Sequence, residues 1–155
     1  MGTALALLGA ALSISLGGWG SSIGVGIAGQ VAAGVTTEKP DLFGKMMLLQ
    51  VIPGTQGVYG FLGFFWVLMK LQLLSGTPAT VSTIQGLQIL LACLPVAITC
   101  LISAPYQGKV AASGMVMTGK DENNLGKGVI YAAMVETYAV LGLLATILAV
   151  NGIKL

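Results

Sequence analysis

The sequence has no histidine and no arginine, and it has few charged residues of either sign. Its 155 residues include seven lysines and five acidic residues, so charged residues make up only 8% of the chain. A soluble domain carries roughly a quarter charged residues. This chain would therefore lack the polar surface of a soluble domain, and its net charge of +2 is too small to indicate nucleic-acid binding. The composition predicts an integral membrane protein.

Cysteine is scarce too, because Cys93 and Cys100 are the only two. Seven residues apart on a helix, they would be separated by about 10 Å along the axis, which is too far for a disulfide. Two thiols without histidine do not make the ligand set of a zinc or haem site. We also find no nucleophile–base pair, so the sequence gives little support to a membrane enzyme.

What the sequence does contain is four long apolar segments, at about residues 4–35, 45–70, 84–118 and 127–150. Each reaches the roughly 20 residues that a helix needs to span a bilayer. The first has no basic leader region, so we interpret it as a transmembrane helix and not as a signal peptide. The sequence predicts an all-α membrane protein of two helical hairpins, residues 1–72 and 84–155, joined by a connector at 73–83.

The two hairpins resemble each other in sequence. IAGQVAAGV at 27–35 is similar to YQGKVAASG at 106–114, which pairs Ile27 with Tyr106. Such internal copies are common in membrane proteins. Continuing this register pairs Gly57 with Glu136, so only the second hairpin has a carboxylate at that place. Small residues recur every fourth position on the first segment, which favours close helix packing. They are Gly20, Gly24, Ala28 and Ala32.

The lysines indicate how the chain is oriented. The connectors after the first and third segments, with their borders, hold four lysines, whereas the other side holds two. These are Lys39, Lys45, Lys120 and Lys127 against Lys70 and Lys154. Lysine marks the cytoplasmic side of membrane proteins. We therefore expect both termini and the 73–83 connector to be extracytoplasmic.

Glu136 is the only charged residue between Gly128 and Val150. An ionised group in mid-bilayer costs about 2.5 kcal/mol or more, so such a residue indicates a functional site. Gln56, Gln107 and Glu136 each lie nine to thirteen residues from a lysine at the predicted cytoplasmic end. At 1.5 Å per residue, all three would lie about 14 to 20 Å deep and could meet at one level.

The motif IPGTQGVY in the second segment supplies further oxygen atoms. Pro53 removes a backbone donor and Gly54 loosens the same turn, which predicts a free carbonyl near Ile52. Four residues would share one helix face. They are Ile52, Thr55, Gln56 and Tyr59.

The candidate ligands are one carboxylate and four neutral oxygens. They come from Glu136, Thr55, Gln56, Gln107 and the carbonyl of Ile52. Such oxygens suit a hard monovalent cation. A pure proton carrier needs little beyond the carboxylate, so we favour Na⁺ over H⁺, with Tyr59 donating its hydroxyl to the carboxylate. H⁺ transport stays open, as does a structural or channel-like protein in which Glu136 is protonated and only bonds helices together.

These motifs resemble those of the membrane rotor (proteolipid) subunit of V-type ATPases. The similarity covers nearly the whole chain and is strongest in VIPGTQGVYG, YQGKVAA and AAMVETYAVLG. Within that family the chain looks most similar to the bacterial Na⁺-pumping branch, and the resemblance assigns the ion site to the same five residues, with Tyr59 supporting the carboxylate.

The resemblance further implies a ring of identical subunits in the bacterial cell membrane, in contact with lipid. Glu136 would lie near the outer rim, facing a basic residue of a stator subunit. The central stalk would dock on the cytoplasmic connectors. ATP hydrolysis would occur in other subunits, so this chain would not be an enzyme on its own.

Overall fold

The computed structural model describes all 155 residues, and nearly all of them are helical. The α-helices are α1 (Gly2–Glu38), α2 (Phe43–Val51), α3 (Thr55–Lys70), α4 (Thr83–Lys120) and α5 (Leu125–Gly152). A short 3₁₀ turn, Ile52–Gly54, joins α2 to α3, so these two helices form one interrupted span. Four spans are long and apolar enough to cross a membrane. The predicted all-α fold with four transmembrane helices is confirmed.

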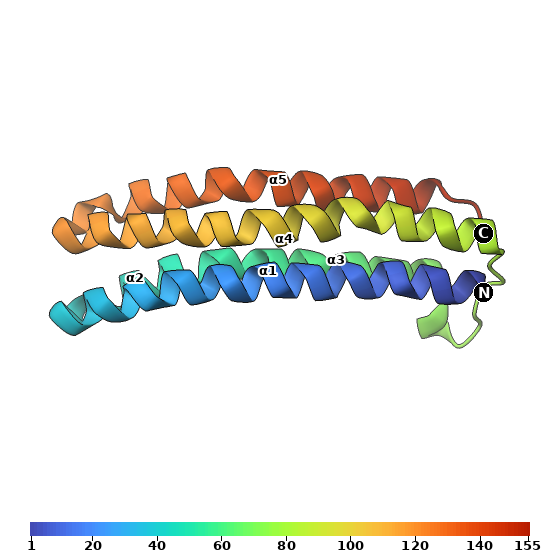
Figure 1. The fold of residues 1–155 in the computed structure, drawn as a ribbon, viewed down its shortest axis with the longest axis horizontal. Coiled ribbons are helices and arrows are strands. Elements are labelled where there is room, and N and C mark those ends of the chain that lie inside the picture. The colour runs from blue at the N-terminus through green and yellow to red at the C-terminus, as the bar shows by residue number, and fades with distance from the viewer.

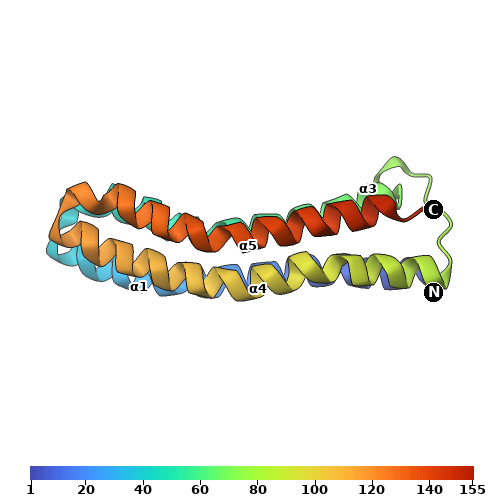
Figure 2. The ribbon, with the colours of Figure 1, turned by 90° about the horizontal axis from the view of Figure 1, so that it is seen from above.

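The four spans form two hairpins that lie side by side (Figure 1). One hairpin consists of α1, α2 and α3, and the other of α4 and α5. The turns at 39–42 and 121–124 lie together at one end, and both termini lie at the other with the connector between α3 and α4. Viewed from above, α1 and α4 form one layer while α3 and α5 form the second (Figure 2).

Polar contacts fix the two ends of the bundle. At the end that carries the short turns, the Lys45 ammonium pairs with Glu122, and Lys39 Nζ donates to the carbonyl of Gly119 at 2.6 Å. At the other end, a capping box begins α4: Ser82 Oγ accepts from the backbone N–H of Gln85, and Gln85 Oε1 accepts from that of Ser82. Such a box satisfies two otherwise unpaired backbone donors.

The stripe of small residues on α1 lies against α4. Gly20, Gly24, Ala28 and Ala32 are all buried. A Cβ atom added to Gly24 would overlap the backbone of Ala104, and one added to Gly108 would overlap the backbone of Gly24. Only glycine permits this backbone-to-backbone approach. The interface between the hairpins is therefore set by main chain, as the spacing predicted.

The repeat pairs Thr55 with Thr137, so the predicted register, which paired Ile27 with Tyr106, is wrong. Thr55 Oγ1 donates to the carbonyl of Ile52, and Thr137 Oγ1 donates to that of Met134 in the same way. Likewise, a Cβ on Gly60 would overlap the carbonyl oxygen of Ser13, and one on Gly142 would meet the equivalent oxygen of Pro95. Glycine- and alanine-rich stretches match almost as well when slipped by about one helical turn, which explains the error.

With the corrected register, Gly54 replaces Gly57 as the counterpart of Glu136. The first hairpin still has no carboxylate at this position. The correction therefore leaves intact the conclusion that the carboxylate occurs once per chain.

Candidate functional site

Two helices, α3 and α4, bring polar side chains to Glu136, which is half-buried in the middle of α5. Tyr59 on α3 donates its hydroxyl to Oε1 of the carboxylate at 2.5 Å. Gln107 on α4 donates from Nε2 to Oε2 at 3.3 Å and to the carbonyl of Ala132 at 3.0 Å. The structure therefore brings α3, α4 and α5 together at the level that the depth argument predicted.

Gln56 extends this network by one further hydrogen bond. Its Nε2 donates to Oε1 of Gln107 at 2.5 Å, and both amide side chains are completely buried. A buried amide needs partners for its donors and its acceptor, because an unpaired buried polar group costs about 1–3 kcal/mol. Here Gln56 donates to Gln107 and Gln107 donates to the carboxylate, so hydrogen bonds link Gln56, Gln107 and Glu136 into one unit.

The 3₁₀ turn at Ile52–Gly54 positions the remaining predicted residues. Thr55 Oγ1 lies 3.0 Å from the carbonyl oxygen of Ile52 and 3.3 Å from Oε1 of Gln56. The Ile52 carbonyl is not free, contrary to our expectation, because it also accepts from the backbone N–H of Thr55. The turn forms where Pro53 cannot supply a backbone donor. The turn thus places the Thr55 hydroxyl and the Ile52 carbonyl beside the glutamine pair.

Two partners in this region were missed by the sequence argument. Ser21 on α1 donates its hydroxyl to the carbonyl of Pro53 at 2.8 Å, so α1 supports the turn. The carbonyl of Ala132 accepts from Gln107 and holds its amide in place. Ser21 was one of many small residues on the first segment, and no sequence signal distinguished it.

One side of Glu136 opens onto a groove at the surface of α5. The groove is lined by Tyr59, Ala133, Glu136, Thr137, Val140 and Leu141. No cationic side chain pairs with Glu136, since the only ion pair in the chain joins Lys45 and Glu122. An ionised carboxylate in this position would be compensated by hydrogen bonds alone. The arrangement can therefore accept a proton or a small cation from the groove.

A family model for the C subunit of ATP synthase matches the chain twice, over residues 8–67 and 90–149. The two matches are of equal length, and aligning them pairs Thr55 with Thr137, in agreement with the register of the hydrogen bonds. The chain belongs to the family of ATP synthase C subunits.

Two relatives refine this membership. The chain is 44% identical over 149 residues to "V-type sodium ATPase subunit K" of Enterococcus hirae, covering 96% of this chain and 92% of the relative. It is 34% identical over 149 residues to "A-type ATP synthase subunit K" of Methanocaldococcus jannaschii, covering 96% of this chain and 63% of the relative. The resemblance to a V-type ATPase proteolipid and the twofold repeat are confirmed. The chain is an ion-translocating rotor subunit and not an enzyme by itself.

Proposed function

We propose that the chain forms the rotor ring of a V-type ATPase and that its Glu136 site binds and carries Na⁺. The observation that carries this proposal is one carboxylate on α5 among amide and hydroxyl groups of α3 and α4, without a cationic side chain beside it. Such a carboxylate can be neutralised reversibly by its cargo, as a carrier requires. The Enterococcus hirae relative is a sodium ATPase subunit by name, which supports Na⁺ as that cargo.

The proposed ligands are the five predicted oxygens: the Glu136 carboxylate, the amide oxygens of Gln107 and Gln56, the Thr55 hydroxyl and the carbonyl of Ile52. The Ile52 carbonyl accepts from both the hydroxyl and the N–H of Thr55, so it would exchange the hydroxyl hydrogen bond for the ion. Gln107 now directs Nε2 at the carboxylate. Each amide carries one donor end and one acceptor end, so a half-turn would present Oε1 to a cation beside Glu136. Neutral oxygens and one carboxylate suit a hard monovalent ion.

The supporting residues hold these ligands in place. Tyr59 hydrogen-bonds Oε1 of Glu136, so the ion would bind Oε2 once the Gln107 amide has turned its Nε2 away from that atom. Pro53 and Gly54 form the turn that orients Thr55 toward the glutamines.

In the proposed cycle, Na⁺ neutralises Glu136 so that the ring can turn through lipid. Where the groove on α5 meets the stator, a basic side chain of the stator pairs with the carboxylate and releases the ion. Moving one charge against 100 mV costs about 2.3 kcal/mol, so binding must be reversible. We place the turns at 39–42 and 121–124 in the cytoplasm of a bacterial cell, where the central stalk docks, and both termini outside.

Carbodiimide labelling of Glu136 in the purified ring tests the choice of ion. We expect millimolar NaCl at neutral pH to protect Glu136, because the bound ion blocks the carboxyl from reacting. KCl at equal ionic strength and the Glu136→Gln variant serve as controls. Equal labelling in NaCl and KCl would exclude the sodium site and favour the same rotor carrying protons.

A further inference from the structure

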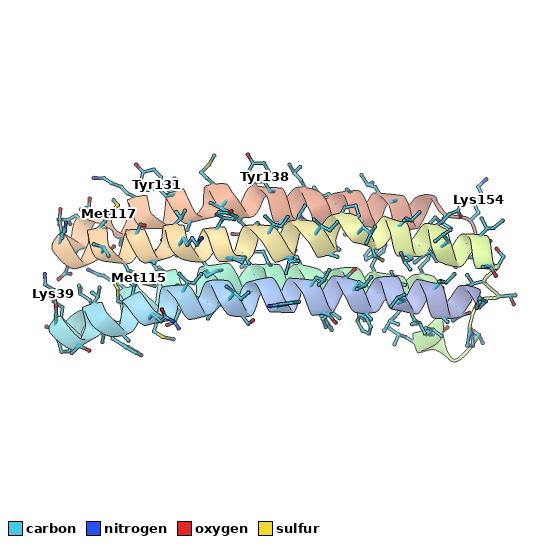
Figure 3. All side chains as sticks on the ribbon, in the orientation of Figure 1. Lys39, Met115, Met117, Tyr131, Tyr138 and Lys154 are labelled. Carbon is cyan, nitrogen blue, oxygen red and sulfur yellow. The ribbon has the colours of Figure 1, made fainter.

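The face of the first hairpin that packs against the second hairpin has an equivalent face on the second hairpin. This equivalent face lies on the outer side and has no partner within the chain. Large apolar residues stand more than half exposed along this face of α4 and α5. They are Ile84, Leu91, Ile102, Tyr106 and Tyr138. Tyr138 points away from α1 and α3 (Figure 3). Because the second hairpin repeats the first, this face of the second hairpin corresponds to the face of the first hairpin that is already covered.

A second stripe of small residues on α1 is likewise without a partner. Gly18, Ser22, Gly26 and Gly34 are spaced by four or eight residues, so they line one side of the helix. A Cβ added to Gly18, Gly26 or Gly34 would meet nothing within 4 Å. The absent side chains therefore leave open notches along this stripe. The corresponding notch at Gly24, on the first stripe, is filled by α4.

The close backbone contacts show which residues of α4 lie beside which residues of α1. Inside the chain, Gly24 lies against the backbone of Ala104 and Gly108. The repeat register places the counterpart of Gly24 at Tyr106, between these two contacts, so the paired helices run side by side at nearly equal levels. We assume that the second hairpin packs on the first hairpin of another copy in the same way. Replacing each contacting residue by its repeat counterpart then gives the contacts between the copies.

In the contacts obtained from the repeat counterparts, large side chains of one copy lie opposite open notches of the next. Tyr106 is the counterpart of Gly24, while Ser22 and Gly26 are the counterparts of Ala104 and Gly108. Tyr106 would therefore lie over Ser22 and Gly26 of the neighbouring copy. Its side chain is 57% exposed, and Lys109 Nζ lies 5.0 Å from the ring centre. This cation–π contact holds the tyrosine on the α4 surface before any copy arrives.

The interface between two copies, which we call the seam, also contains part of the ion site at the equivalent position, but without its charge. Thr137 still donates to the Met134 carbonyl, as Thr55 does to that of Ile52. The counterparts of the other ligands lack carboxylate and amide groups. Gly54 replaces Glu136, Val25 replaces Gln107, and Tyr138 replaces Gln56. The large Tyr138 ring would fill the space that Val25 and Gly54 leave open.

We propose that the α4–α5 face of one copy docks on the α1–α3 face of the next, with Tyr106 over Gly26 and Tyr138 closing the ion-free counterpart of the site. This inference rests on the proposed ring of identical copies. It adds that the ring has two alternating kinds of seam. One is a backbone-tight seam with a cation site inside each chain, and the other is a seam of tyrosines in glycine notches between chains.

Disulfide cross-linking tests the seam directly. In rings lacking the two native cysteines, we expect oxidised Gly26→Cys/Tyr106→Cys chains to form a ladder of multimers on denaturing gels that collapses on reduction. A Gly126→Cys/Tyr106→Cys pair is the control and should give no ladder, because Gly126 is equally open but lies beside the turn at 121–124. A ring without the ladder overturns the seam and leaves the proposed function standing, whereas failure of the parent to form a ring overturns both.

A steric test uses the same notch. Gly26→Leu fits the isolated chain, since nothing occupies that space, but it would collide with Tyr106 of the neighbouring copy. We expect at least a tenfold loss of intact ring on native gels, restored by adding Tyr106→Ala, while Gly126→Leu assembles normally. Normal assembly of Gly26→Leu, or no recovery in the double variant, contradicts the seam.

Discussion

Gln107→Leu is the substitution that most directly probes the proposed ligand set. Gln107 is completely buried and makes three hydrogen bonds, to Glu136, to the carbonyl of Ala132 and from Gln56. Leucine has a similar volume, so the packing between α4 and α5 is largely kept. The change removes the oxygen that a rotated amide would give to Na⁺ and leaves the Gln56 amide without its acceptor.

The expected loss follows from these contacts. An interaction between a neutral polar group and a charge contributes about 1.5–3 kcal/mol. Since about 1.4 kcal/mol corresponds to a factor of ten, Na⁺ binding should weaken by roughly 10- to 100-fold. The unpaired amide of Gln56 should lower the free energy of unfolding by about 1–3 kcal/mol in addition.

The assay is the NaCl concentration that gives half-maximal protection of Glu136 from carbodiimide. We expect it to rise 10- to 100-fold in Gln107→Leu and to stay unchanged in Gln88→Leu, which removes an exposed glutamine from the same helix. Native gels check that both variants assemble. If Gln107→Leu assembles and is protected at the parent's NaCl concentration, Gln107 is not a ligand and the reasoning is refuted.

Three other predictions concern the carboxylate, its tyrosine and the orientation of the chain. Glu136→Gln should assemble into rings but abolish ATP-driven Na⁺ uptake in reconstituted vesicles, because no charge remains to exchange the ion; retained uptake would remove the carrier role. Tyr59→Phe loses the hydroxyl that donates to Oε1, so half-protection of Glu136 should need about tenfold more NaCl. An unchanged value would show that Tyr59 does not orient the carboxylate. Single cysteines at Ser75 and Asn123 should differ in intact cells, where a membrane-impermeant maleimide should label Ser75→Cys only; the reverse pattern would invert the orientation.

Several features of this protein follow from sequence because they depend only on local composition and on distance along a helix. Four apolar runs predict four spans. A single acid in the last run, and two glutamines at a similar distance from the lysine-bearing end, predict a shared level. The rise per residue is fixed, so depth can be counted without knowing how the helices pack.

Other features were decided by tertiary packing. The hydrogen bond from Ser21 to Pro53 and the carbonyl of Ala132 that holds Gln107 could not be predicted from the sequence, and our internal comparison placed the repeat in the wrong register. Glycine-rich helices offer nearly the same surface after a shift of one turn, so comparing the two halves of this one sequence gave the wrong register, whereas the family model pairs Thr55 with Thr137. The physical reason for that register is the close contact of one main chain with another, and that contact exists only when the helices have assembled.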